Sequence, residues 1–273
     1  MFKVDIEKCI SCEQCIKDCP VSDIYLKEDK AYIKNEACLK CGHCIAICPV
    51  EAVCTDEYDM NEVVSYKKEE FDIKPETLLN FIKFRRSVRR FKNKEVEKEK
   101  IEQIIEAGRF TETSTNSQDV SFTVVTKELD KIKDLTYEIL RKKGEYILDN
   151  LNDDNRHFER YARLWVNMYE AHKKDPKKYD RLFFNAPLAI VVSANNEIDG
   201  GLASSNMELM TDAIGLGTYF NGFFIRGAGD NKELLDLLQI KEGKKLISCM
   251  VIGYPDVKYQ RTVPRKKPDI TWM

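Results

Sequence analysis

Two cysteine runs near the start of the chain share one spacing and could hold metal clusters. Each run reads C-x2-C-x2-C-x3-C and is followed by a proline, Pro20 or Pro49. The first run contains Cys9, Cys12, Cys15 and Cys19, and the second contains Cys38, Cys41, Cys44 and Cys48. An iron–sulfur cubane is held by four cysteine thiolates, and this spacing is the bacterial one. The two runs therefore predict two [4Fe–4S] clusters.

The two runs are copies of one unit. They begin 29 positions apart, and nearby apolar residues match as well, as in Ile16 and Ile45. Such self-similarity indicates an internal duplication. The first three cysteines of a run can surround one cluster, while the fourth binds the other cluster. We therefore assign one cluster to Cys9, Cys12, Cys15 and Cys48, and the second to Cys38, Cys41, Cys44 and Cys19.

Zinc and disulfide bonds fit this pattern less well. A zinc site uses four ligands, with a longer gap between two cysteine pairs. A disulfide scaffold has no need of two identical runs. Residues 1–56 resemble a bacterial 2[4Fe–4S] ferredoxin. Cys54 lies outside both runs, and we expect it to be a small apolar filler near the second cluster.

A second group of residues could bind phosphate. Arg85, Arg86, Ser87 and Arg89 follow an expected helix and offer guanidinium and hydroxyl donors. Taken alone, such a basic run is more often a solvated surface. The sequence has no G-x-G-x-x-G, P-loop or H-E-x-x-H motif. The part of the chain after the cysteines is therefore not expected to be a Rossmann dehydrogenase.

Five short motifs, in this order, resemble the FMN-dependent nitroreductase family over residues 76–268. They are R-R-S-V-R-R-F at 85–91, T-S-T-N-S-Q at 113–118, A-P before an apolar run at 186–187, A-I-G-L-G-T at 213–218, and I-G-Y-P at 252–255 with the basic tail V-P-R-K-K at 263–267. The chain departs from the family at Asp119 and Val120, where members often have Pro-Trp.

The resemblance implies an FMN site and a homodimer with cross-dimer contacts. It implies an α+β fold with a central mixed sheet flanked by helices. By this resemblance, Arg85, Arg86, Ser87 and Arg89 would contact the FMN phosphate and ribityl chain. Ser114 and Asn116 would make the contacts across the dimer, and Arg265 and Lys267 would make the contacts of the tail. No acid–base pair is evident, so no catalytic residue is assigned.

The hydrophobic pattern predicts the elements that position these residues. We expect helices over 77–84, 97–110, 129–143, 155–174, 201–217 and 234–238, and strands over 121–126, 187–194 and 246–253. The predicted organisation is a ferredoxin-like domain at 1–57, a linker at 58–75 and a nitroreductase-like α+β domain at 76–273.

Residues 144–180 form a charged segment longer than in compact family members. It could be a lid over the substrate site or a docking surface for the N-terminal domain. As an amphipathic helix, its core-facing residues would be Tyr161, Leu164, Met168 and Ala171. His157 and His172 are expected at the surface.

Charge and composition limit the function classes. The 273 residues carry a net charge of −2, which argues against a nucleic-acid binder. Residues 1–57 hold 7 Lys, no Arg and 11 Asp or Glu, so the acidic charge lies at the N-terminal end. No apolar run reaches the roughly 18–20 residues that span a bilayer, and no signal-peptide pattern is present. We therefore expect a cytoplasmic protein without a membrane partner.

Together these features predict an iron–sulfur flavoprotein oxidoreductase. It would relay electrons between the two clusters and FMN to reduce an electrophilic small molecule such as a nitroaromatic, a quinone or an activated alkene. The electron donor is left open between NAD(P)H and a reduced protein partner. Two alternatives also stay open: an electron carrier without flavin, and a redox-sensing flavoprotein without substrate turnover.

Overall fold

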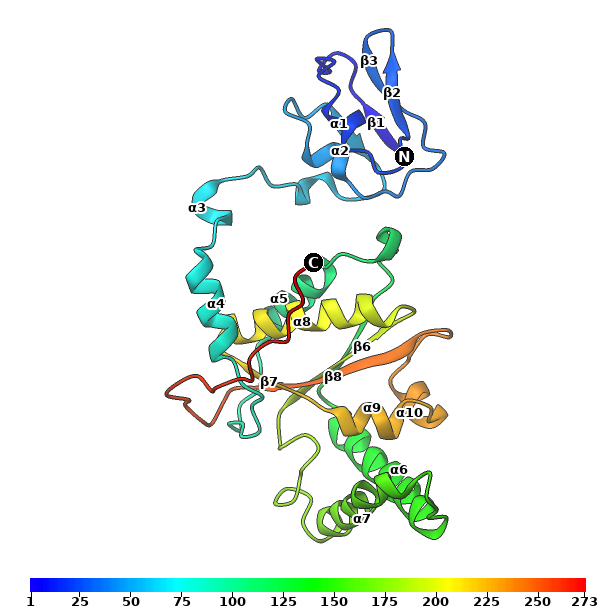
Figure 1. Cartoon of the computed structure of the whole chain (residues 1–273), viewed down its shortest axis with the longest axis vertical. Coiled ribbons are helices and arrows are strands. Elements are labelled where there is room, and N and C mark those ends of the chain that lie inside the picture. The colour runs from blue at the N-terminus through cyan, green and yellow to red at the C-terminus, as the bar shows by residue number, and fades with distance from the viewer. The chain divides into compact units, whose positions relative to one another are not determined.

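The computed structural model describes all 273 residues except the side chain of Ala228. The chain forms two compact units, which are coloured along the sequence in Figure 1. The first contains Met1–Lys74 and Thr115–Ser117, and the second contains Pro75–Ser114 and Gln118–Met273. Among the described residues, no helix is long and apolar enough to cross a membrane.

The first unit repeats one strand–helix–strand pattern. Its first half contains β1 (Phe2–Val4), α1 (Gln14–Lys17) and β2 (Ile24–Lys27), and its second half contains β3 (Lys30–Ile33), α2 (His43–Ala46) and β4 (Val53–Thr55). β1 pairs antiparallel with β4, and β2 pairs antiparallel with β3. Each short helix begins inside a cysteine run. The duplication read from the sequence is therefore a duplication of structure.

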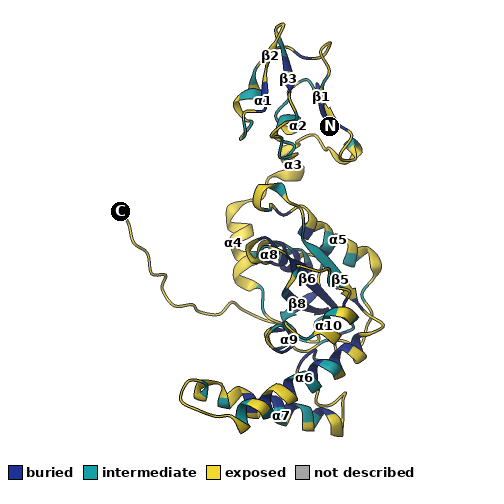
Figure 2. Cartoon of the chain, turned by 90° about the vertical axis from the view of Figure 1, so that its right-hand side faces the viewer, coloured by how far each residue is buried: buried dark blue, intermediate teal, exposed yellow. Residues whose placement is uncertain are grey.

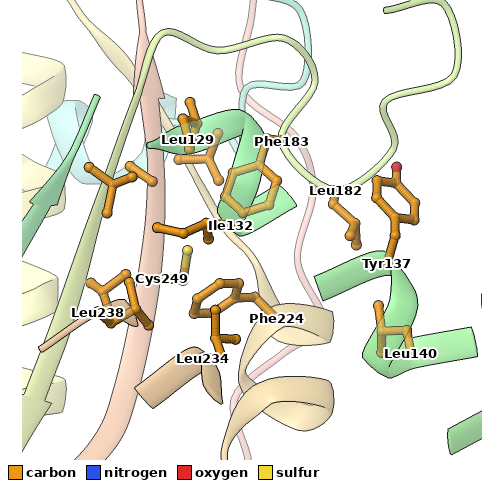
Figure 3. Packing of buried hydrophobic residues seen from close by; sticks show 14 of the residues in the cluster. Leu129, Ile132, Tyr137, Leu140, Leu182, Phe183, Phe224, Leu234, Leu238 and Cys249 are labelled. Carbon is orange, nitrogen blue, oxygen red and sulfur yellow. The ribbon is translucent and has the colours of Figure 1, made fainter. Parts of the chain in front are cut away.

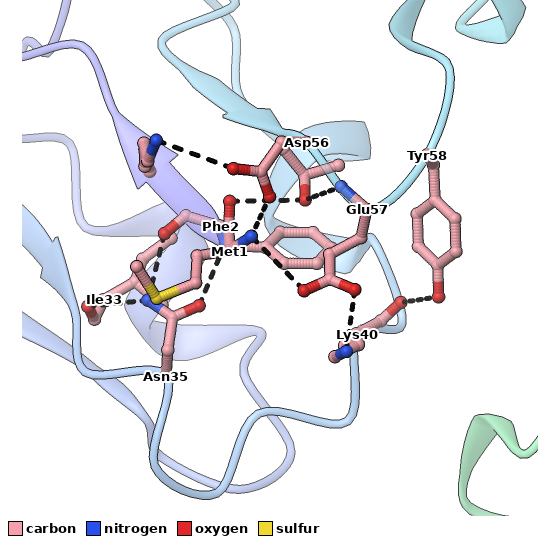
Figure 4. Close-up of polar contacts among 10 residues, drawn as sticks. Met1, Phe2, Ile33, Asn35, Lys40, Asp56, Glu57 and Tyr58 are labelled. Atoms are coloured by element: carbon pink, nitrogen blue, oxygen red, sulfur yellow. Dashed lines mark hydrogen bonds and ion pairs between the residues drawn. The ribbon is translucent and has the colours of Figure 1, made fainter.

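Polar contacts close the two ends of this unit (Figure 4). Asn35 accepts from the backbone N–H of Phe2 at 2.9 Å and donates to its carbonyl at 3.0 Å. The amino group of Met1 pairs with Asp56, and Glu57 pairs with Lys40 at 2.7 Å. The Tyr58 hydroxyl donates to the Lys40 carbonyl at 3.0 Å. These contacts fix β1 against the loop that carries the second cysteine run.

Residues that follow β4 contain little regular structure. A single 3₁₀ turn, η1 (Met60–Glu62), and a short helix, α3 (Lys68–Phe71), are the elements described before residue 75. Asp59 caps η1 by accepting from the Asn61 N–H at 3.0 Å.

The second unit is built on a four-stranded sheet in the order β5-β6-β8-β7. The strands are β5 (Ser121–Val125), β6 (Leu188–Ala194), β7 (Gly217–Phe220) and β8 (Lys245–Gly253). Every strand pair described in this sheet is antiparallel, so the expected mixed sheet is corrected. Val125, at the end of β5, lies opposite Ala189, near the start of β6. The helices between them therefore bring the chain back to the end of the sheet that it left.

The described part of the second unit also contains seven helices, and all but the exposed α4 lie over the faces of this sheet or on helices that do. They are α4 (Pro75–Phe84), α5 (Lys98–Arg109), α6 (Leu129–Asp149), α7 (Glu159–Lys174), α8 (Glu197–Ala213), α9 (Gly222–Ala228) and α10 (Lys232–Leu237), with 3₁₀ turns η2 (Ser114–Asn116) and η3 (Arg156–Phe158). Figure 2 shows the buried residues concentrated on the strands between these helices. The predicted α+β class is confirmed.

The central strand β6 joins two hydrophobic clusters. Its residues Ala189 and Val191 pack with α6, α7, α9 and α10, and Figure 3 shows this cluster around Cys249 and Phe224. Its residues Leu188 and Ile190 pack on the other side, with α5 and α8. Because both faces of β6 are buried, its sequence is apolar throughout instead of alternating.

Three details of the elements differ from expectation. Helix α8 runs from Glu197 to Ala213 rather than from 201 to 217, because Asn196 caps its start by accepting from the Ile198 N–H at 2.9 Å. Gly215, with φ of 78°, ends the helical path. Strand β7 and helix α9 follow, and the sequence pattern did not indicate either one.

Helix α7 buries part of the face that was expected. Its buried residues are Ala162, Trp165, Met168 and His172. The prediction is confirmed for Met168 and for Leu164, which is partly buried and packs against the core, but it is wrong for Tyr161, which is exposed. Ala171 is half-buried. His172 is only 2% exposed, which corrects its predicted surface position. Its ring stacks on Tyr137 and its Nε2 lies 2.9 Å from an Asp134 carboxylate oxygen.

The prediction for Cys54 is also wrong, because this side chain is exposed. Its neighbours Val53 and Thr55 point into the core of the first unit. Side chains alternate between the two faces of a strand, so Cys54 must point outward.

Candidate functional site

The second cysteine run lies around a pocket in the first unit. The pocket is lined by Cys38, Cys41 and Cys44 together with Cys19 from the first run, and by apolar residues such as Ile24. These four cysteines are the set assigned to the second cluster. The ligand assignment itself stays a prediction, which the variants described in the Discussion address.

The cysteine thiols of the two runs also act on one another electrostatically. Burial raises the pKa of the Cys15 thiol, and the nearby charges of Cys12 and Cys48 raise it further. Burial likewise raises the pKa of Cys44 to about 12, with added repulsion from Cys38 and Cys41. Cys48 thus acts on Cys15, its expected cluster partner, and Cys15 acts in turn on Cys44 of the other expected set. Iron ions facing these sulfurs would supply the positive charge that favours the thiolate.

The donor set, four thiolates for each expected cluster, has the chemistry that a cubane needs. Within the described residues, no group of three or more His, Cys, Asp or Glu side chains converges as the ligands of one metal ion. A cubane needs a wider arrangement, because each thiolate binds a different iron. Backbone N–H groups already point at the fourth cysteine of each run: Asp23 N–H to Cys19 Sγ at 3.4 Å, and Ala52 N–H to Cys48 Sγ at 3.2 Å.

A basic pocket of about 570 Å³ lies in the second unit. Its lining includes the predicted residues Arg85, Arg86, Ser87, Arg89 and Arg265. Val263, from the tail motif at 263–267, and Tyr259, which the sequence did not single out, also line it. The Nε of Arg85 and the Nη2 of Arg86 are buried and have no hydrogen-bond partner among the described residues. Buried guanidinium donors without partners are costly, so this pocket fits an anion such as a phosphate.

The chain leading into this pocket is held by the edge of the sheet. Val88 N–H donates to the Thr218 carbonyl of β7 at 2.9 Å, and Lys92 N–H donates to the Tyr254 carbonyl at 2.8 Å. Arg89 lies 4.6 Å from the ring centroid of Tyr219, also in β7. Strand β7 therefore sets the direction in which the arginine run faces the pocket.

Gly217 allows this close contact, and we expect Gly217→Ala to disturb it. An added Cβ would lie 2.5 Å from Val88 Cγ2. Overpacking of this kind costs about 1–3 kcal/mol, and the arginine run would have to move. Thermal unfolding would measure the loss of stability, and FMN titration would measure the loss of affinity. Gly201→Ala is the matched control, because a Cβ there meets nothing within 4 Å outside its own helix. Equal losses of stability and affinity in both variants would contradict the prediction.

Arg85 is held by an acidic side chain of α8. Its Nη1 forms an ion pair with the carboxylate of Glu208, whose side chain is 8% exposed. One turn further along α8 lies Asp212, and its Oδ2 is buried without a hydrogen-bond partner among the described residues. Burial raises the pKa of Asp212 to about 7, the charge of Glu208 adds to this effect, and Arg85 opposes it.

Ser114 is anchored to the start of the same helix. Its backbone N–H donates to both carboxylate oxygens of the buried Asp199 at 3.1 Å, and its hydroxyl accepts from Asn196 at 3.0 Å. Thr115 and Asn116 follow with φ of 52° and 55°. Within the first unit, which includes Thr115–Ser117, Asn116 donates to the carbonyls of Leu39 and Lys40 at 3.0 Å.

Asp199→Asn should loosen the segment at 113–118. The amide can accept only through one oxygen and carries no charge, and hydrogen bonds to charged groups contribute about 1.5–3 kcal/mol. Thermal unfolding should show a lower midpoint. Ser114→Ala keeps the backbone N–H that Asp199 binds, so its unfolding midpoint should fall by less than that of Asp199→Asn. A larger fall for Ser114→Ala would contradict this account.

Lys267 and His43 lie apart from these contacts. Lys267 is exposed in the extended tail and is not among the described residues that line the basic pocket, whereas Arg265 is. His43, inside the second cysteine run, lies in α2, where its Nδ1 is 3.1 Å from a carboxylate oxygen of Asp18.

The pattern of residues is that of a known family. Residues 82–254 match the Nitroreductase family, and residues 1–49 match the 4Fe-4S dicluster domain. The chain belongs to the nitroreductase family. The prediction of a nitroreductase-family domain behind an N-terminal 4Fe–4S dicluster domain is therefore confirmed.

Individual relatives agree with this assignment. An NADPH-dependent oxidoreductase of Staphylococcus aureus (strain USA300) is 25% identical over 162 residues. The match covers 59% of this nitroreductase-family chain and 59% of the relative's length. A Bacteroides fragilis nitroreductase with bound FMN is 20% identical, with a TM-score of 0.55 over 71% of this chain and 98% of its own. One from Desulfitobacterium hafniense, also with bound FMN, is 22% identical, with a TM-score of 0.51 over 74% and 100%. The two structures share the fold.

Proposed function

We propose that this chain is an iron–sulfur flavoprotein oxidoreductase that relays electrons between two [4Fe–4S] clusters and one FMN per chain. Residues 1–57 would hold the clusters and residues 76–273 the flavin, joined by a linker at 58–75. The acceptor would be an electrophilic organic molecule such as a nitroaromatic, a quinone or an activated alkene.

The observation that carries the flavin half is the basic pocket. Arg85 and Arg86 line it together with Ser87, Arg89 and Arg265, and each of these two side chains has one buried nitrogen without a partner in the described part of the chain. Forked guanidinium donors suit the phosphate of FMN. The two nitroreductases of similar fold were each solved with bound FMN, which supports the same ligand here.

The residues of the chain bind and orient, while the cofactors supply the redox chemistry. Bound FMN exchanges electrons singly or in pairs, which suits it to connect one-electron clusters with a two-electron acceptor. Lys267 and the cross-dimer contacts of Ser114 and Asn116 remain part of the proposed FMN site. The S. aureus relative is named for NADPH, which favours NADPH as one electron donor, with a reduced protein as the other candidate.

We infer that the active form is a homodimer. The α5–α8 face carries an apolar groove with Phe110, Met210 and Ile214, and Phe110 is 67% exposed. Exposed apolar surface of this kind marks an interaction site. Sedimentation analysis at several protein concentrations measures the oligomeric state. A monomer at every concentration would contradict the inference.

The composition of the purified protein tests the proposal. After anaerobic purification, iron, acid-labile sulfide and released flavin are counted per chain. About eight iron, about eight sulfide and about one FMN support the proposed function. Eight iron without flavin, and none bound on adding FMN, would overturn the flavin half and leave an electron carrier.

Turnover tests the enzyme half. The loaded protein is offered NADPH or a reduced ferredoxin, with a nitroaromatic and a quinone as acceptors. Acceptor reduction that depends on bound FMN supports an oxidoreductase. Full cofactor loading without turnover of any acceptor would favour a redox-sensing flavoprotein.

A further inference from the structure

The charged groups behind the basic pocket form a three-residue cluster. Arg85 reaches from the end of α4 to Glu208, and Asp212 lies one turn further along α8, so both carboxylates are on one face of the helix. The Glu208 side chain is almost fully buried, and the Asp212 Oδ2 and the Arg85 Nε have no partner in the described part of the structure. One guanidinium thus pairs with Glu208 and also acts electrostatically on the Asp212 carboxylate.

We propose that Glu208 and Asp212 are positioning residues for Arg85, and that the charge state of Asp212 sets how tightly the pocket binds a phosphate group. This inference rests on the proposed FMN site. Glu208 fixes the direction of the guanidinium. Asp212 decides whether the cluster is neutral overall or carries one negative charge behind the phosphate.

The sign of the effect follows from the charges. With Asp212 protonated, Arg85 and Glu208 cancel, and the remaining guanidinium donors of Arg85 are available to an anion. With Asp212 ionised, a second carboxylate competes for Arg85 and repels the phosphate. The pKa of Asp212 near 7 places this change at neutral pH. Phosphate affinity should therefore fall as the pH rises through 7.

Several other titratable groups around α8 are engaged elsewhere. On α5, Lys98 pairs with Glu102 and Arg109 pairs with Glu106, while Glu99 lies in the groove with Met210 and Ile214. On α5, Lys100 donates to the Ile214 carbonyl at 3.3 Å and to the Tyr254 hydroxyl at 2.9 Å, and that hydroxyl donates to Glu97 at 2.5 Å. On the strands that pack against α8, the titratable side chains are Lys245, Tyr219 and Cys249. Lys245 pairs with Glu197 at the opposite end of α8, Tyr219 lies beneath Arg89, and Cys249 belongs to the other hydrophobic cluster.

The test is the pH dependence of FMN affinity in the full chain with its clusters in place and its flavin removed. Flavin fluorescence quenching is titrated between pH 6 and pH 9 for wild type, Asp212→Asn and the exposed control Asp236→Asn. The phosphate of FMN titrates near pH 6 by itself, but this effect is common to all three proteins. Riboflavin, which lacks the phosphate, is titrated alongside.

At pH 6, the FMN affinity of Asp212→Asn should equal that of wild type. At pH 8.5, Asp212→Asn should bind FMN about three- to ten-fold more tightly than wild type does, as expected for removal of one nearby charge. The control variant should follow wild type throughout, and riboflavin affinity should not respond. In Glu208→Gln, the loss of FMN affinity should begin at a lower pH than in wild type, because Glu208 helps to raise the pKa of Asp212.

Calorimetry in buffers of different ionisation enthalpy gives a second readout. Near pH 7, wild type should take up more protons on binding FMN than Asp212→Asn does. FMN affinities of Asp212→Asn that track wild type at every pH would overturn this inference alone. Failure of wild type to bind FMN at any pH would overturn the proposed function as well.

Discussion

Cys48→Ser should abolish the cluster that Cys9, Cys12 and Cys15 help to bind. The cluster bound by the other cysteines of its own run should remain. The charge of Cys48 acts on Cys15, while Cys19 shares a pocket with the second run. Iron per chain should fall from about eight to about four. Iron and sulfide analysis after anaerobic purification measures the loss.

Paired substitutions identify which cluster has been lost. Cys12→Ser with Cys48→Ser should lose no more iron than either single variant, because both residues belong to one cluster. Cys41→Ser with Cys48→Ser should lose both clusters. Non-additive losses of this kind report a shared site. The reverse pattern would contradict crossed ligation, and the exposed Cys54→Ser is the control that should keep all its iron.

Arg86→Ala should raise the dissociation constant for FMN about 10- to 100-fold, since a hydrogen bond to a charged group contributes about 1.5–3 kcal/mol. Its Nη1 already donates to the carbonyls of Lys83 and Arg85, which fixes the guanidinium while Nη2 stays unpartnered within the described structure. Equilibrium titration with FMN and with riboflavin measures the effect, and riboflavin affinity should change little.

Two further variants separate charge from geometry. Arg86→Lys keeps the charge but lacks the planar fork, so it should recover only part of the affinity. Arg163→Ala, on the exposed side of α7 and paired with Glu159, is a control of equal size and charge. If Arg163→Ala weakens FMN binding as much as Arg86→Ala does, the effect is one of overall charge and the pocket is not the phosphate site.

Local spacing was enough to predict the cluster domain. Cysteine runs such as Cys9–Cys19 place their ligands within a few residues of one another, so the geometry of the loop follows from the sequence itself. The long apolar run at β6 and the helical periodicity of α4, α5 and α6 were predicted for the same reason: each is a repeat along one segment. The family motif at 85–91 likewise lies on consecutive residues.

Features that depend on distant segments required the tertiary structure. The short strand β7 is defined by its pairing with β8, and Cys54 is exposed because β4 turns that side outward. His172 is buried by Tyr137, which lies 35 positions earlier in the chain. Local pattern carries no record of such partners.

The same division holds for the candidate site. The sequence by itself determined that Arg85 and its neighbours offer donors for a phosphate. Only the tertiary structure paired Arg85 with Glu208, placed Asp212 beside it, and bound Ser114 to Asp199. The physical reason is that the direction and charge of a binding group depend on buried partners. Those partners come from α8, more than 80 residues away along the chain.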